Sequence, residues 1–267
     1  MIPTAEERLH FLQDMQLLLD EGSYSSTYKY ALLLALSDLA VERGDVGGAE
    51  LLIGADEIAG RFIEYYWRQT APYPALGGSS KVLLQNKGRQ AAIAENVKQM
   101  QKEAGGSIAR ARSETTHWQK LVKSVAQTVQ VMPLWKLQRV RSGVRDFLYE
   151  NVGRGNSITL RPGVAFCLRE FHGQIQNMVQ GAWAREIRGM KQNAPIMGET
   201  ADLHEFLFGS ERASLSVYVP LLRHLQEDHC FYCKQALRSR GEVDHFVPWA
   251  RYPPGPGAQF RAGTPAV

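Results

Sequence analysis

The run from Tyr30 to Leu36 constrains the fold more than any other stretch, because it is apolar on nearly every face of the helix that it predicts. That helix is expected from about Thr27 to Arg43, and Gly44 follows it. A helix that is hydrophobic all round has to be covered on all sides. The chain has 267 residues, of which 44% are hydrophobic. It is therefore long enough to build the surrounding core in one large domain or two.

The N-terminal segment carries the signals of another helix. Thr4 and Glu7 have the spacing of a capping box, with Thr4 as the N-cap and Glu7 at the third helical position. Gly22 is expected to end this helix. Apolar residues recur at helical spacing between these signals, namely Leu9, Leu12, Met15, Leu18 and Leu19.

Most of the remaining chain is also expected to be helical, which predicts a mainly α fold. A short apolar run from Leu51 leads into a helix that begins near Ala55, and residues 157–160 are expected to form a short strand. Pro133 interrupts one helical run, which is expected to resume over residues 134–149. The other expected helices span about residues 88–102, 107–131, 164–190, 202–208 and 214–227.

Two cysteines near the C-terminal end have the spacing of a metal knuckle. Cys230 and Cys233 enclose two residues, and a Cys-x-x-Cys turn supplies half of a tetrahedral zinc site. The alternatives are a chance spacing and a redox pair of the thioredoxin type, which needs a surrounding βαβ pattern that is missing here. His229 precedes the pair, and the commoner fate of such a histidine is exposure to solvent. Three cysteines suit a reducing cytoplasm better than a disulfide framework.

Asp244 and His245 follow on a short expected strand. A carboxylate is a hard metal ligand and a neutral imidazole is a general base, so this pair suits metal-assisted attack by water. A surface pair at the end of a strand is the alternative. Val247 continues the apolar run and Pro248 stops it, because proline cannot donate a ladder hydrogen bond.

The stretch from Cys230 to Trp249 resembles the HNH endonucleases, whose nuclease core is a ββα-metal finger. The resemblance implies that Asp244 is a ligand of a catalytic Mg²⁺ or Mn²⁺ ion, that His245 is the general base, and that Cys230 and Cys233 hold a structural Zn²⁺ ion. It covers about the last forty residues. A weaker likeness covers Thr27 to Leu34 and the helical chain behind it, which look similar to bacterial proteins that carry this nuclease at their C-terminal end. A restriction or defence enzyme is one role that such an endonuclease could have.

The sequence departs from the HNH pattern on the C-terminal side of this pair. The family needs a further His, an Asn and a second Cys-x-x-Cys, but no His follows His245, no Cys follows Cys233 and no Asn follows Asn193. Residues 253–267 are dominated by Pro and Gly, and we expect them to be a disordered tail. We therefore expect a truncated or frame-shifted chain with half a zinc site and a weak or inactive nuclease.

The stretch from Ala104 to Arg145 has the most uneven charge in the chain, since Glu114 is its only acidic residue. Basic side chains in such a stretch can neutralise phosphates of DNA or RNA, and the alternative is a solvated helix face. The net charge of +4 is compatible with a nucleic-acid partner without being diagnostic. The candidate nucleic-acid-binding residues are Arg110, Arg112, Lys120, Lys123, Lys136, Arg139, Arg141 and Arg145.

Three other features have a structural and a functional interpretation. The aromatic cluster of Tyr65, Tyr66 and Trp67 could stack on bases, but packing at the end of a helix is the better explanation. Cys167 and His172 lie in an expected helix, and each is better explained as a core or satisfied side chain than as a metal ligand.

The sequence predicts a helical N-terminal body with a small, incomplete C-terminal HNH module. The body is expected over residues 1–210, followed by a connecting helix (211–227), the partial module (228–252) and the tail (253–267). We expect a cytoplasmic DNA endonuclease with no membrane span or signal peptide, and RNA as target and a homodimer stay open. The alternative function is a non-catalytic module that binds nucleic acid or another protein.

Overall fold

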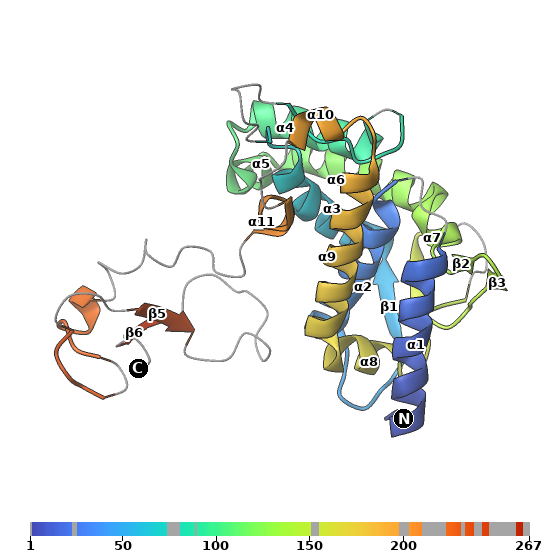
Figure 1. Cartoon of the computed structure of the whole chain (residues 1–267), viewed down its shortest axis with the longest axis horizontal. Coiled ribbons are helices and arrows are strands. Elements are labelled where there is room, and N and C mark those ends of the chain that lie inside the picture. The colour runs from blue at the N-terminus through green and yellow to red at the C-terminus, as the bar shows by residue number, and fades with distance from the viewer. Residues whose placement is uncertain are drawn as a thin grey trace. The chain divides into compact units, whose positions relative to one another are not determined.

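The computed structural model describes residues 2–22, 26–73, 81–88, 90–150, 155–197, 203–209, 223–230 and 233–237, and the backbone of 242–245 and 260–263. Two compact units divide the chain, Met1–Phe208 and Gly209–Val267. The first unit is built almost entirely of helices (Figure 1), which confirms the mainly α fold class. Within the described residues, no helix has both the length and the apolarity to cross a membrane.

The central helix is α2 (Tyr28–Arg43), and it is covered on all sides as its sequence requires. Every residue from Tyr30 to Leu36 is buried. The surrounding helices are α3 (Ala55–Gln69), α8 (Val164–Glu170) and α9 (His172–Gly189), and α9 lies beside α2 along its length (Figure 1). The segment that is apolar on every face therefore forms the middle of the core.

Helix α1 (Ala5–Glu21) begins and ends where its signals predict. The backbone N–H of Glu7 donates to Thr4 Oγ1 at 3.3 Å, and the backbone N–H of Thr4 donates to Glu7 Oε2 at 2.7 Å. This reciprocal pair is a capping box, and it satisfies two N–H groups that a helix start leaves without partners. Gly22 closes the helix by donating to the carbonyl of Leu18. Phe11, Met15 and Leu18 face the core.

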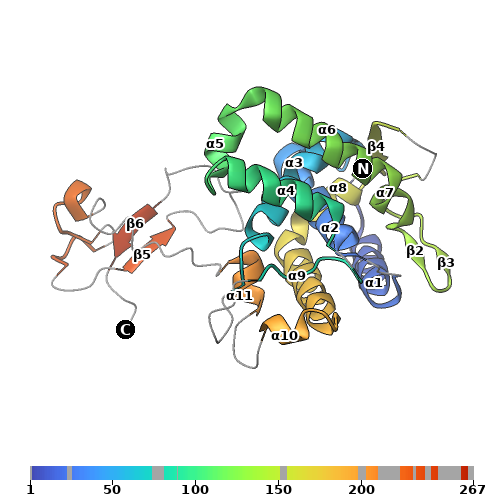
Figure 2. The same cartoon turned by 90° about the horizontal axis from the view of Figure 1, so that it is seen from above.

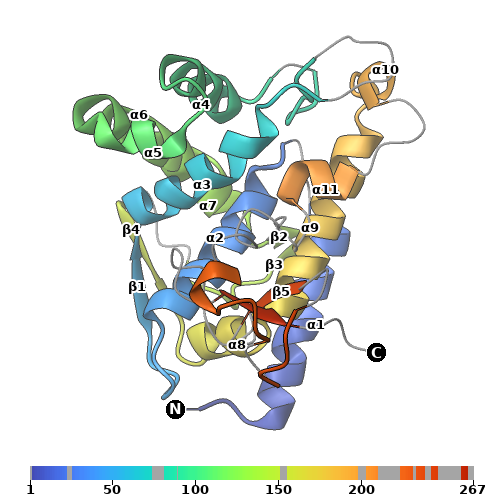
Figure 3. The same ribbon diagram turned by 90° about the vertical axis from the view of Figure 1, so that its left-hand side faces the viewer.

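Strand β4 (Ser157–Leu160) forms where it was predicted, but its partner is distant in sequence. It pairs antiparallel with β1 (Leu51–Gly54), with Leu51 opposite Leu160 and Gly54 opposite Ser157. The two-stranded ribbon lies beside α2 and α3 (Figure 3). It ties the two halves of the unit together across roughly a hundred residues of intervening chain.

Helices α4 (Ala92–Glu103), α5 (Ile108–Ser113) and α6 (Thr115–Val131) form a layer against α3 (Figure 2). The sequence predicted one helix over residues 107–131, but the chain breaks at Glu114, whose φ of −82° and ψ of 67° are not helical. Helices α8 and α9 are likewise separate, because Phe171 between them departs from helical geometry.

The predicted helix over residues 134–149 is wrong. Only the short α7 (Pro133–Lys136) forms, and the chain then enters a hairpin of β2 (Arg139–Val140) and β3 (Gly143–Val144). Gly143 has a φ of 137°, which glycine adopts readily and other residues rarely. The buried Gln138 side chain provides backbone groups of this segment with hydrogen-bond partners that a helix would otherwise supply. Its Oε1 accepts from the backbone N–H of Leu148 and its Nε2 donates to the carbonyl of Tyr149, both at 2.8 Å.

Two short helices end the first unit. They are α10 (Ala194–Met197) and α11 (Leu203–Phe208), and α11 packs against α3 and α9. The expected connecting helix over residues 211–227 lies mostly outside the described residues, although 223–225 are helical.

Within the described part of the second unit, β5 (Glu242–His245) pairs antiparallel with β6 (Phe260–Gly263). Strand β5 forms on the segment predicted to be a strand. Strand β6 lies within residues 253–267, the tail that the sequence predicts to be disordered. Pairing with β5 gives the backbone groups of these four residues hydrogen-bond partners.

Candidate functional site

The two knuckle cysteines lie on a tight antiparallel turn. His229 and Ala236 form a β-bridge, the N–H of Cys230 donates to the carbonyl of Gln235 at 2.8 Å, and the N–H of Lys234 donates back to Cys230 at 2.9 Å. Lys234 has a φ of 56°, in the left-handed region that lets the chain reverse directly after Cys233. Backbone hydrogen bonds therefore fix the turn that carries both sulfurs.

The two cysteines of this turn differ in exposure. Cys230 is buried and Cys233 is exposed, and neither forms a disulfide. Among the described residues, no group of three or more potential ligands converges on one point. His229 is exposed, and its Nδ1 lies 2.5 Å from the carbonyl of Glu227, so that nitrogen donates to the backbone. The described residues around the turn therefore contain no complete set of metal ligands.

Asp244 and His245 are the last two residues of β5. Their partners across the ribbon are Arg261 and Phe260 on β6. The structure describes only the backbone here, so the side chains of both residues lie outside the description. Val247, Pro248 and Trp249, which contribute to the resemblance, also lie outside the described residues.

The eight predicted nucleic-acid-binding residues are all exposed, and they fall into two groups. Four lie on α5 and α6, and the other four lie on α7 or along the β2–β3 hairpin. Arg112 differs from the other seven residues because its side chain already has partners. It forms an ion pair with Glu64, and its guanidinium lies 5.4 Å from the Trp118 ring centroid. Within the described residues, the other seven have no ion pair.

Sequence reasoning missed one basic residue, Lys29. It lies in the first turn of α2 and is buried, with an exposed fraction of 6%. Its pKa is lowered to about 8, mainly by burial and to a smaller extent by the positive charges of Lys136 and Arg139. Lys136 and Arg139 therefore act electrostatically on a third cation nearby. The available sequence signal was a lysine directly before the apolar run from Tyr30 to Leu36.

A second group that the sequence did not reveal centres on Asp38. Its Oδ1 lies 2.8 Å from His172 Nε2 and accepts from Gln176 Nε2 at 3.3 Å, and its Oδ2 accepts from the Tyr65 hydroxyl at 2.5 Å. The carboxylate thus links α2, α3 and α9. The pKa of Tyr65 is raised well above its usual value, mainly by burial and then by the negative charge of Asp38. His172 is a satisfied side chain, as the sequence indicated.

The aromatic cluster packs inside the unit. Tyr66 is fully buried and Trp67 nearly so, and the Tyr66 hydroxyl lies 2.6 Å from Thr27 Oγ1. Bases cannot stack on rings that are already covered by protein. Cys167 is buried as well, and burial raises the pKa of its thiol to about 11.

The fold and the site define a mainly helical domain followed by a second unit with a cysteine turn. The profile of one protein family, described as a domain of unknown function (DUF8808), matches residues 10–207. The chain belongs to this family. The matched region coincides closely with the helical unit and ends before Cys230. No curated protein and no solved structure matches the chain.

Proposed function

We propose that this protein is an HNH-type endonuclease that hydrolyses phosphodiester bonds of DNA with a divalent metal ion. The observation that carries the proposal is the order of features in the second unit. A hairpin turn with two cysteines is followed by a short strand that ends in Asp244 and His245.

Each residue of the pair has a distinct role in this proposal. His245 accepts the proton of an attacking water, because an imidazole with an ordinary pKa near 6.5 is largely basic at neutral pH. Asp244 holds the catalytic cation. A bound Mg²⁺ or Mn²⁺ ion supplies polarisation of the scissile phosphate and stabilises the leaving oxygen.

We propose that cleavage by these 267 residues is slow. The sequence contains no His after His245 and no Asn after Asn193 to complete the metal site. A cation held mainly by one carboxylate binds weakly, because affinity grows with the number of charged ligands. Zinc bound by Cys230 and Cys233 alone is weak for the same reason, so we expect less than one zinc per chain after gel filtration.

The proposed DNA contacts come from the helical unit. Seven exposed cations that form no ion pair with the described residues leave their charges available to phosphates, whereas Arg112 is already paired with Glu64. We propose that this unit selects or holds the target and that the second unit cuts it. A restriction or defence role would follow from that division of labour.

Plasmid nicking tests the proposal. Supercoiled DNA is incubated with excess protein and Mg²⁺, Mn²⁺ or EDTA. We expect slow nicking with either metal, none with EDTA, and loss of nicking in Asp244→Asn. Equal nicking with EDTA, or an Asp244→Asn variant as active as the original protein, would contradict the assignment. Tight binding of one zinc ion per chain would contradict the proposed half-site.

The second candidate is a non-catalytic nucleic-acid-binding module. The exposed cations on α5 and α6 favour it, since they need no metal to attract phosphates. DNA binding that weakens steeply with salt, with no metal-dependent nicking, would select this function over the nuclease.

A further inference from the structure

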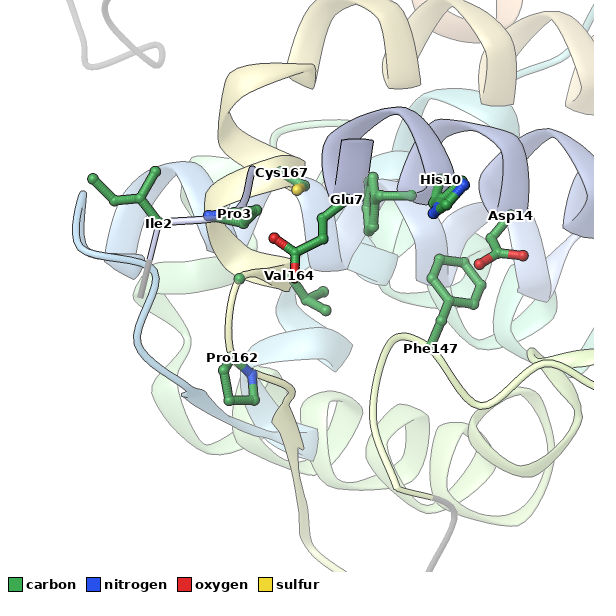
Figure 4. A pocket seen from close by; sticks show the side chains of 11 residues that line it. Ile2, Pro3, Glu7, His10, Asp14, Phe147, Pro162, Val164 and Cys167 are labelled. Atoms are coloured by element: carbon green, nitrogen blue, oxygen red, sulfur yellow. The ribbon is translucent and has the colours of Figure 1, made fainter. Parts of the chain in front are cut away.

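A groove lies between helix α1 and the start of α8, in a part of the helical unit that the nuclease proposal does not use. Its volume is about 410 Å³, within the range of ligand pockets. Glu7, His10 and Asp14 lie in a row along α1 on one side (Figure 4). Phe147 and Val164 face them from the other side.

The floor of the groove is apolar and aromatic. Phe11 and Phe147 pack edge to face with their ring centroids 5.7 Å apart. Cys167 lines the same groove, and burial raises the pKa of its thiol to about 11. The thiol is therefore neutral at physiological pH and adds no charge. An aliphatic chain could cover these surfaces and bury apolar area.

The rim is acidic. Glu7 is held in place by the capping box, and its pKa is lowered because the Thr4 backbone and hydroxyl donate to its carboxylate. The Asp14 carboxylate forms no hydrogen bond or ion pair with any described residue. None of the residues that line the groove, all of which the structure describes, is Lys or Arg. The groove therefore presents negative charge above an apolar floor.

A metal ion does not match this arrangement. Glu7 and Asp14 are seven residues apart on one helix, which separates them by about 10 Å along its axis. Within the described residues, no three potential ligands converge. A cation carried on an apolar body fits better, because it needs only one carboxylate for its charge while its body covers the aromatic faces.

We propose that this groove binds a small organic cation, specifically an aliphatic amine. Its hydrocarbon chain lies over Phe11 and Phe147, and its ammonium group pairs with Asp14, because the Glu7 carboxylate already accepts hydrogen bonds from Thr4. The proposal is independent of the nuclease assignment, since all the groove residues belong to the helical unit. Failure of either proposal leaves the other unaffected.

Ligand-observed NMR titration of the full chain tests it with three probes of equal chain length, n-hexylamine, n-hexanol and hexanoate. We expect hexylamine to bind most tightly and hexanoate least. Asp14→Asn should weaken hexylamine binding by about fivefold, the effect of one partly exposed charge pair. Glu7→Gln should weaken binding by a smaller factor, because the Glu7 carboxylate attracts the ammonium group only from a distance, and Gln can still complete the capping box.

The matched control is Glu6→Gln, which removes an equal charge from the same helical turn outside the groove. It should leave hexylamine binding unchanged, and circular dichroism should show that all three variants stay folded. Equal binding of hexanol and hexylamine, equal loss in Glu6→Gln, or no saturable binding of hexylamine would overturn the proposal.

Discussion

His172 Nε2 lies 2.8 Å from Asp38 Oδ1 and joins the start of α9 to the middle of α2. The same carboxylate accepts from the Tyr65 hydroxyl of α3, so three helices meet at one acidic side chain. We expect Asp38→Asn to lower the free energy of unfolding by about 2 kcal/mol, because it weakens charge-assisted hydrogen bonds that are partly shielded from water. Urea denaturation measures the change.

The control for Asp38 is Glu50→Gln, which neutralises an exposed carboxylate with no partner among the described residues. It should change the free energy of unfolding by less than about 0.5 kcal/mol. A double-mutant cycle of Asp38→Asn with Tyr65→Phe should give a coupling of about 1 kcal/mol. Additive single effects would show that the hydrogen bond contributes nothing to stability.

The buried Gln85 side chain is a second point where distant segments meet. Its Oε1 accepts from Thr27 Oγ1 at 2.9 Å and from Trp183 Nε1 at 3.0 Å. We expect Trp183→Phe to cost about 2–3 kcal/mol, since it removes a buried donor and leaves a space in the core. Trp118→Phe, at a partly exposed site, should cost less than about 1 kcal/mol. Thermal and urea unfolding of both variants would compare them.

Lys29 gives a pH dependence with a defined sign. Its pKa is about 8 in the folded protein and near 10.5 when unfolded. Between these values the unfolded chain binds the proton and the folded chain does not, so this residue makes stability rise with pH. Below pH 8 its charging opposes folding by up to about 3 kcal/mol.

The test for Lys29 is the difference between the original protein and Lys29→Met. Buried tyrosines with raised pKa values act in the opposite direction at high pH, but they contribute equally to both proteins. Between pH 8 and pH 10, we expect the free energy of unfolding of the original protein to rise relative to that of Lys29→Met. Parallel stability curves would show that Lys29 titrates normally.

The exposed lysines of α6 should contribute to nucleic-acid binding without sequence preference. We expect Lys120→Gln and Lys123→Gln each to weaken binding of a DNA duplex and to reduce the slope of log affinity against log salt by up to about 1. Lys191→Gln, an exposed lysine outside this basic stretch, should leave the slope unchanged. Fluorescence anisotropy at several salt concentrations measures it, and identical slopes for all variants would argue against contact through α6.

Local signals predicted the parts of the fold that local interactions determine. The capping box at Thr4 and Glu7, the buried run in α2 and strand β4 all formed where the sequence indicated. The helix expected over residues 134–149 failed because Gln138 bonds to backbone groups about ten residues away, which no periodicity reveals. The pairing of β1 with β4 could not be predicted either, because the two strands are far apart in the sequence.

The candidate sites also differ in whether their residues are close together or far apart in the sequence. Cys230 and Cys233 could be found from their spacing, since the knuckle is local in sequence. The network around Asp38 could not, because its members come from three helices that meet only in the folded chain. The groove along α1 is similar, since Glu7 and Phe147 are far apart in sequence.

The nicking rate of His245→Ala tests the central claim most directly. It is compared with His224→Ala, which removes an exposed histidine from the same unit, at fixed Mn²⁺ concentration and excess protein. Loss of a general base should slow nicking by about a hundredfold or to background, while His224→Ala nicks at the original rate. If His245→Ala cuts as fast as the original protein, His245 does not activate the attacking water and the nuclease proposal fails.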